Sequence, residues 1–295
     1  MPNQQIHSKA IFNQKVKELK DETNFSIGEI QSQLFILFKH FFQLHKTAVL
    51  ADKIISIRTE DEEKFNRAIR QIKNNEPIQY ITGKADFYGL EFKVNPSVLI
   101  PRPETEELVD LIINENKVQQ KGLNLLDIGT GSGCIAICLA KELNQAKVSS
   151  IDISKDALKT AKENAVLNAT SVNFIEYDIL KYPLNPFPIS EFDIIVSNPP
   201  YITQSEKTQM QNNVLDYEPH LALFVEDTSA LIFYEKITEI AKNLLLKGGR
   251  LYFEINEQFG KETADLLKKN HFTNVKILQD IHQKDRMVSG IFSGI

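Results

Sequence analysis

The four residues Asn198-Pro199-Pro200-Tyr201 follow directly after an apolar run at residues 192–196. Neither proline has a backbone N–H and each has a fixed φ, so the local carbonyl groups point outward with little freedom. The Pro199 carbonyl and the Asn198 side-chain oxygen then form a pair of hydrogen-bond acceptors beside the Tyr201 ring. Such a pair suits a planar –NH2 group, either an amide or the exocyclic amine of a base. Taken alone, the Pro-Pro pair also fits a simple strand end.

A second motif, at residues 124–133, is an apolar run followed by a glycine-rich turn. Its glycines let the backbone bend sharply and approach a ligand that a Cβ would hold off. Asp152 ends the next apolar run, near the offset of about 20 residues at which a carboxylate meets ribose hydroxyls. A nicotinamide dinucleotide would bring a pyrophosphate to this turn, and Asp127 would repel it. The charge therefore favours the cationic sulfonium cofactor S-adenosylmethionine, although the glycines alone also fit a tight structural turn.

Asp178 closes a third strand-like run, and Ile179 follows it. The carboxylate is suited to accept from an adenine amino group while Ile179 packs on the ring, but Asp178 alone fits a solvated strand end equally well. The complete set of predicted cofactor-binding residues is Asp127, Gly129, Thr130, Gly131, Ser132, Gly133, Asp152, Asp178, Ile179 and Asn198.

Methyl transfer from a sulfonium is an in-line displacement that depends on alignment more than on a strong base. An amide nitrogen is a poor nucleophile, and two acceptors on its N–H bonds would orient it and stabilise the positive charge it gains. Tyr201 would hold the flat group against its ring. The predicted catalytic residues are Asn198, Pro199 and Tyr201, and the predicted substrate-binding residues are Asn198, Pro199, Pro200 and Tyr201.

The composition is that of an ordinary globular protein, with 42% hydrophobic and 25% charged residues. The net charge of −5 argues against a general phosphate-binding surface, so no direct nucleic-acid binding is expected. The six histidines show no ligand spacing, and no metal site is predicted. The chain has no apolar run of membrane-spanning length and no signal-peptide core near its start. It is therefore expected to be cytoplasmic, without a membrane partner.

Three domains are predicted along the chain. Residues 1–75 have apolar positions at helical spacing, which predicts a small helical domain. Residues 76–103 change to extended patterns and predict a linking β-hairpin, with strands at 78–83 and 87–94 and a turn at Gly89. Residues 104–295 alternate between strands and helices, which predicts a doubly wound α/β domain with ligands beyond the carboxyl ends of its strands.

The elements predicted in that last domain are a helix opening at Glu104, strands near 124–128, 147–152, 172–177, 192–197, 250–256, 274–279 and 287–293, and helices near 133–145, 155–167, 228–246 and 258–269.

The glycine-rich turn and Asn-Pro-Pro-Tyr together resemble the amino-methyltransferases, which act on adenine N6 or on protein glutamine. Other segments narrow the resemblance to the HemK/PrmC family of peptide chain release factor N5-glutamine methyltransferases, and it covers roughly residues 77–293. These segments are Pro77-x-x-Tyr80-x-x-Gly83, Phe87-Tyr88-Gly89, Ile100-Pro101-Arg102-Pro103-Glu104-Thr105-Glu106, Tyr217-Glu218-Pro219-His220-Leu221-Ala222-Leu223 and Lys284-Asp285-Arg286-Met287-Val288.

The resemblance implies a Rossmann-like, S-adenosylmethionine-dependent methyltransferase domain whose seven strands are ordered 3-2-1-4-5-7-6, the last antiparallel. It implies transfer to the side-chain amide nitrogen of the glutamine in the Gly-Gly-Gln motif of class I release factors, with S-adenosylhomocysteine as product. By analogy with the family, the helical domain at residues 1–75 is expected to recognise the substrate. A monomer is expected. Two positions depart from the family: Ile179 stands where a larger apolar residue is common, and residues 224–227 replace a glycine-rich stretch.

Three alternatives remain at this point. A ribosomal-protein glutamine methyltransferase shares both motifs but tends to carry Pro-Arg-Ser-Pro where this chain has residues 101–105. An adenine-N6 nucleic-acid methyltransferase would stack a flipped base on Tyr201 but needs a basic channel. A non-catalytic scaffold is disfavoured by the intact glycines and Asn198.

Overall fold

The computed structural model describes residues 4–116, 122–181 and 191–294, and these form two units. The first unit comprises the chain up to Gly83 together with the later segment Asn212–Tyr217, and the second comprises Lys84–Gln211 and Glu218–Ile295. The Tyr217 hydroxyl donates to the Asn74 carbonyl at 2.8 Å, which ties the inserted segment to the first unit.

The first unit is mainly helical, as the apolar spacing predicted. At the start of α2 (Ile27–Phe42), the N-cap residue Ser26 and Glu29 form a reciprocal capping box, and the helix buries Leu34 and Phe38. Phe38 meets Phe65 of α4 edge to face at 5.4 Å between ring centroids. The helices of this unit are α1 (Ser8–Glu22), α2 (Ile27–Phe42), α3 (Lys46–Leu50), α4 (Thr59–Lys73), α5 (Ile78–Thr82) and α9 (Asn212–Tyr217).

Two predictions for this part of the chain were wrong in detail. The first unit also holds a two-stranded antiparallel sheet of β1 (Gln4–His7) and β2 (Ile54–Ile57). This sheet was not predicted, because the period of a short apolar run does not distinguish a helix from a strand. Residues 78–83 were expected to be extended, yet Ile78–Thr82 is helical, starts after Pro77 and ends at Gly83 in the left-handed region.

The predicted β-hairpin is present, but its first strand lies at residues 84–87 and not at 78–83. It joins β3 (Lys84–Phe87) to β4 (Leu90–Lys93) and belongs to the second unit. Tyr88 and Gly89 both have positive φ, which is the geometry of a tight two-residue hairpin turn. The expected turn at Gly89 is therefore confirmed.

The second unit is built on a seven-stranded sheet in the order β12-β13-β11-β8-β5-β6-β7. Numbered along the chain, this is the expected order 3-2-1-4-5-7-6, and β13 runs antiparallel to β11 and β12. The strands are β5 (Asn124–Ile128), β6 (Lys147–Asp152), β7 (Val172–Glu176), β8 (Phe192–Ser197), β11 (Leu245–Glu254), β12 (Phe272–Gln279) and β13 (Asp285–Phe292). The predicted α/β fold class is confirmed.

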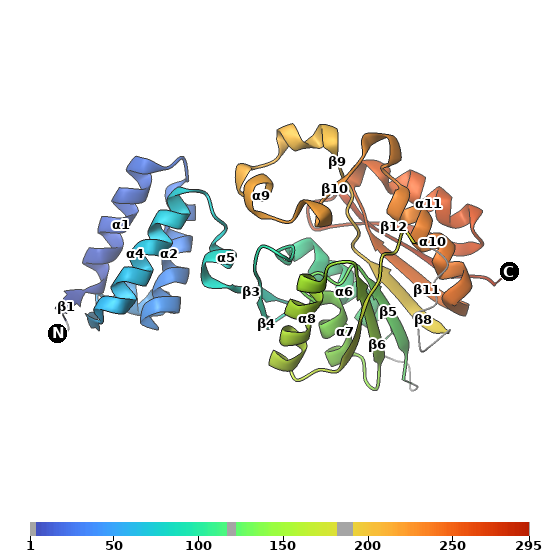
Figure 1. The fold of residues 1–295 in the computed structure, drawn as a ribbon, viewed down its shortest axis with the longest axis horizontal. Coiled ribbons are helices and arrows are strands. Elements are labelled where there is room, and N and C mark those ends of the chain that lie inside the picture. Colours follow the sequence, from blue (N-terminus) through green and yellow to red (C-terminus); the bar gives the residue numbers. More distant parts are fainter. Residues whose placement is uncertain (1–3, 117–121, 182–190, 295) are drawn as a thin grey trace. The chain divides into compact units, whose positions relative to one another are not determined.

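Helices cover both faces of this sheet, because successive strand residues point to opposite sides. Ile194 and Val196 of β8 face one core, and Ile195 between them faces the other. Figure 1 shows the two helix layers on either side of the strands. One layer comprises α6 (Pro103–Asn116), α7 (Cys134–Glu142) and α8 (Lys155–Leu167), and the other α10 (Ile232–Leu244) and α11 (Gly260–Lys269).

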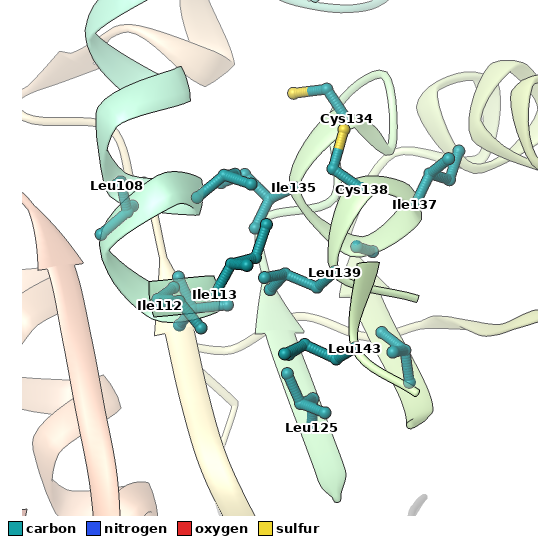
Figure 2. Packing of buried hydrophobic residues seen from close by; sticks show 14 of the residues in the cluster. Leu108, Ile112, Ile113, Leu125, Cys134, Ile135, Ile137, Cys138, Leu139 and Leu143 are labelled. Carbon is teal, nitrogen blue, oxygen red and sulfur yellow. The ribbon is translucent and has the colours of Figure 1, made fainter. Parts of the chain in front are cut away.

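The first layer positions the glycine-rich turn. Figure 2 shows Ile112 and Ile113 of α6 beside Ile135 and Leu139 of α7, near Leu125 of β5. Burying an aliphatic side chain of this size contributes about 1.5–3 kcal/mol. This apolar packing anchors α7, whose N-terminus receives the turn from β5.

The remaining short elements follow β8 and β11. They are β9 (Ile202–Thr203), β10 (Phe224–Val225) and the 3₁₀ turns η1 (Gln204–Gln209), η2 (His220–Ala222), η3 (Asp227–Ser229) and η4 (Glu257–Phe259). Residues 224 and 225, which belong to the stretch that departs from the family pattern, form β10. This strand pairs in parallel with β9, which directly follows Asn-Pro-Pro-Tyr.

Candidate active site

The order of the strands reverses at β5: β6 and β7 follow on one side of it, and β8 and β11 lie on the other side. The switch point of the sheet therefore lies between the neighbours β5 and β8. Ile128 pairs with Ser197, so Gly129 and Asn198 follow their strands side by side. A cavity of ≈ 410 Å³ lies at this edge. Ten predicted site residues line it: Gly129, Thr130, Gly131, Ser132, Asp152, Asp178, Ile179, Asn198, Pro199 and Pro200.

The glycine-rich turn is held by the carboxylate at the end of β6. The Gly131 N–H donates to Asp152 Oδ2 at 2.9 Å, and the Ser154 N–H donates to Oδ1 at 2.8 Å. Burial raises the pKa of Asp152, while these backbone donors oppose the rise. A Cβ built on Gly131 would meet nothing within 4 Å, so the turn presents bare backbone to the cavity.

Gly133 has a packing role and is not among the lining residues. It has φ +84° before the first turn of α7, and an added Cβ would lie 3.0 Å from Ile137 Cδ1 and 3.1 Å from Ala161 Cβ. Of the three glycines, it is the one that allows α7 and α8 to approach each other.

Asp127 is also absent from the cavity wall and is 1% exposed. The Ser150 hydroxyl donates to its Oδ2 at 2.7 Å, whereas Oδ1 is buried without a hydrogen-bond partner. Ser150 Oγ lies 2.6 Å from Thr130 Oγ1, so Thr130 donates to Ser150 when Ser150 donates to the carboxylate. Asp127 thus reaches the lining residue Thr130 through Ser150.

We expect Asp127 to impose a pH dependence on stability. Burial raises its pKa from 3.8 to about 7, so the unfolded chain loses this proton near pH 4 and the folded chain near pH 7. Between these values the unfolded state binds fewer protons, and the free energy of unfolding falls as pH rises. Between pH 5 and pH 8, wild type should lose about 2–3 kcal/mol relative to Asp127→Asn, measured by urea unfolding.

The exposed carboxylate of Asp265 on α11 gives a control of opposite sign. A hydrogen bond from Lys268 lowers its pKa, so wild type should not lose stability relative to Asp265→Asn as pH rises. A stability difference between wild type and Asp127→Asn that does not change with pH would contradict the assignment.

The Asn198 amide is attached to a buried hydrogen-bond network. Its Nδ2 donates to Thr105 Oγ1 of α6 at 3.2 Å, and the Thr105 hydroxyl donates to Glu254 Oε2 at 2.7 Å. The Tyr201 hydroxyl donates to the second carboxylate oxygen, Glu254 Oε1, at 3.1 Å. Burial raises the pKa of Glu254, while hydrogen bonds from Thr105 and Tyr201 and the charge of Arg286 oppose the rise.

Tyr201 is placed differently from the expectation. Its ring packs against the core on the α10 side of the sheet, and it is not among the residues that line the cavity. The predicted contact of this ring with a planar substrate group therefore stays a prediction.

Sequence reasoning missed one wall of the cavity, formed by the segment before α6. The Arg102 guanidinium donates to Glu218 Oε1 at 2.6 Å, and the Ile100 N–H donates to Glu218 Oε2 at 3.3 Å. The Glu218 side chain is 1% exposed, so this bond fixes the segment firmly. The segments that contain Arg102 and Glu218 were both part of the family resemblance, but no chemical role had been predicted for their residues. The missed lining residues include Val98, Leu99, Pro101, Arg102, Thr105, Pro219, Leu221 and Ala222.

Among the described residues, no group of three or more His, Cys, Asp or Glu side chains is arranged to hold a metal ion. Within the same ranges, no helix has the length and apolar character needed to cross a membrane.

Comparison with known proteins agrees with this geometry. Residues 119–291 match the family model of a methyltransferase domain, and residues 16–83 match that of the PrmC N-terminal domain. A methyltransferase structure from Pyrococcus furiosus shares the fold with a TM-score of 0.52 at 21% identity, covering 78% of this chain and 99% of that one. Fold and site together define a methyltransferase.

Curated relatives identify the family. The release factor glutamine methyltransferase of Flavobacterium psychrophilum is 50% identical over 90% of this chain and 92% of its own length. The protein of the same name from Bacteroides thetaiotaomicron is 48% identical over 77% of this chain and 80% of its own. The chain belongs to the release factor glutamine methyltransferase family.

Proposed function

We propose that this protein transfers a methyl group from S-adenosylmethionine to the side-chain amide nitrogen of the glutamine in the Gly-Gly-Gln motif of class I release factors. The observation that carries the proposal is the shared cavity: Asn198 and Pro199 line it together with the glycine-rich turn. A methyl donor and a planar amide held there would be adjacent. Family membership names the acceptor, since the relatives described above are named for release factor glutamine methylation.

The volume and the lining of the cavity support S-adenosylmethionine as its ligand. Its volume of ≈ 410 Å³ is that of a small-molecule site. Bare backbone at Gly129 and Gly131, the carboxylates of Asp152 and Asp178, and apolar Ile179 would hold the amino acid, ribose and adenine parts. When bound, this cofactor supplies an electrophilic methyl group.

The residues of the chain would then act on the acceptor. Asn198 Oδ1 and the Pro199 carbonyl accept the two N–H bonds of the glutamine amide, which orients its nitrogen. As that nitrogen gains positive charge, both hydrogen bonds strengthen, so they stabilise the transition state more than the ground state. The nitrogen would gain the methyl group as the S–CH3 bond breaks, with S-adenosylhomocysteine as the leaving group. It would then lose one proton to water, so no strong base is required.

The test supplies labelled S-adenosylmethionine with a purified class I release factor or with its variant in which the Gly-Gly-Gln glutamine is alanine. We expect label on the first protein alone. Equal labelling of both proteins would overturn the glutamine assignment. Parallel reactions receive ribosomal protein, RNA or DNA in place of the release factor. Label on ribosomal protein alone would select the sister activity, and label on RNA or DNA alone would select an adenine-N6 enzyme.

The working form of the protein also stays a prediction. We expect a cytoplasmic monomer that binds the release factor directly, and light scattering of the purified chain measures its mass. A stable dimer at micromolar concentration would contradict that expectation.

A further inference from the structure

The Asn198 side chain can serve as an acceptor only if its amide has one orientation. An amide has a donating end, Nδ2, and an accepting end, Oδ1, and the two ends are nearly equal in shape. If Nδ2 faced the glutamine, it would meet another pair of N–H donors. The structure must therefore determine which end faces the cavity.

Thr105 and Glu254 determine it. The Glu254 carboxylate is 1% exposed and accepts one hydrogen bond at each oxygen, from Thr105 and from Tyr201. Thr105 has a single hydroxyl proton, and that proton is given to Glu254. The Thr105 oxygen can then only accept from Asn198, so Nδ2 turns to Thr105 and Oδ1 is the end left for a ligand.

The surroundings of Glu254 support its role as an acceptor. Besides Thr105 and Tyr201, the groups that act on it are Glu104 of α6 and Arg286 of β13. Arg286 is anchored by its Nε–H, which donates to Asp280 Oδ2 at 3.1 Å, and its side chain is only 16% exposed. Burial has the largest effect on the Glu254 carboxyl and raises its pKa, whereas the hydrogen bonds from Thr105 and Tyr201 and the charge of Arg286 favour the ionised form.

We propose that Thr105 and Glu254 are positioning residues that fix the Asn198 amide with its oxygen toward the reacting nitrogen. This inference rests on the proposed function, because it needs an acceptor that presents N–H bonds to Asn198. It gives Thr105 a function, which is to orient the Asn198 amide. Arg286 supports the same function through Glu254, and it belongs to the segment Lys284-to-Val288 that carried part of the family resemblance.

Without the Thr105 hydroxyl, the Asn198 amide has no partner that selects its orientation, and its oxygen faces the substrate for only part of the time. The loss appears in kcat, since the hydrogen bonds to the nitrogen strengthen in the transition state. We expect Thr105→Val to lower kcat about 10- to 100-fold. The dissociation constant of S-adenosylmethionine and the KM for the release factor should change by less than about 3-fold.

Thr105→Ser, which keeps the hydroxyl, should restore kcat to within about 3-fold of wild type. Thr105→Ala removes the hydroxyl without placing a methyl against Glu254, and it carries the test if the valine variant fails to fold. Tyr234→Phe is the matched control, because the Tyr234 hydroxyl bonds to the Glu254 main-chain carbonyl at 3.3 Å and not to its carboxylate. It should retain wild-type kcat.

A double-mutant cycle completes the experiment. In an Asn198→Ala background, Thr105→Ala should cost almost nothing further in kcat, because the group that Thr105 orients is already absent. Additive losses, wild-type kcat in both Thr105→Val and Thr105→Ala, or an equal loss in Thr105→Ser would each overturn the inference. Failure of the proposed function is seen separately, as absence of glutamine labelling by wild type.

Discussion

Replacing Asn198 by alanine should lower kcat for release factor methylation by about 100- to 1,000-fold, the usual effect of removing one preorganised hydrogen-bonding group from a transition state. The affinity for S-adenosylmethionine should remain within about 3-fold of wild type, because the glycine-rich turn and Asp152 stay intact. Single-turnover transfer measures the first quantity and calorimetric titration of the cofactor measures the second.

Asn243→Ala is the matched control for that substitution. Asn243 is an exposed residue of α10 whose Nδ2 donates to the Glu239 carbonyl, and its loss should leave transfer unchanged. If Asn198→Ala instead loses most of its cofactor affinity and keeps its kcat, Asn198 is mainly a cofactor ligand and the proposed role is wrong.

The second large effect is expected at Gly133. An alanine there combines an unfavourable φ of +84° with a Cβ 3.0 Å from Ile137 and 3.1 Å from Ala161. Left-handed strain and overpacking together predict a loss of about 3 kcal/mol in the free energy of unfolding. The added Cβ would also displace α7 and the glycine-rich turn that precedes it, so cofactor affinity should fall as well.

Gly248→Ala separates the two causes. Gly248 has nearly the same φ, +85°, but an added Cβ would meet nothing within 4 Å. Strain alone predicts a loss of about 1 kcal/mol there, with unchanged cofactor binding. Equal losses in the two variants, measured by urea unfolding, would mean that the approach of α7 and α8 does not depend on Gly133.

Much of the fold was predictable, because most of its helices and strands are long enough for the pattern of apolar residues to identify them. The alternation of strands and helices from residue 124 onward specified a doubly wound sheet, and the structure confirms the predicted elements, with ends that differ by at most five residues. The short segments were not predictable with the same accuracy. Residues 78–82 and 54–57 are too brief for their period to separate helix from strand, so packing within their units decides.

The candidate site divides in the same way. Most of the cavity wall around the glycine-rich turn was predictable, since parallel strands deliver their carboxyl ends to one edge and the glycines mark the place. The wall at residues 97–102 was not, because it depends on the pairing of Arg102 with Glu218, 116 residues apart in the chain. A bond of that kind leaves no periodic signal in either segment.

By itself the sequence determined where the two informative motifs lie: the proposed acceptor pair at Asn198 and Pro199, and the glycine-rich turn proposed for a methyl donor, each written within a few neighbouring residues. Only the tertiary structure decided how that chemistry is aimed. Thr105 lies 93 residues from Asn198 and 149 from Glu254, and the hydrogen bonds among them orient the amide. Local backbone geometry dictates a turn, whereas the direction of a side-chain dipole depends on buried partners that folding brings together.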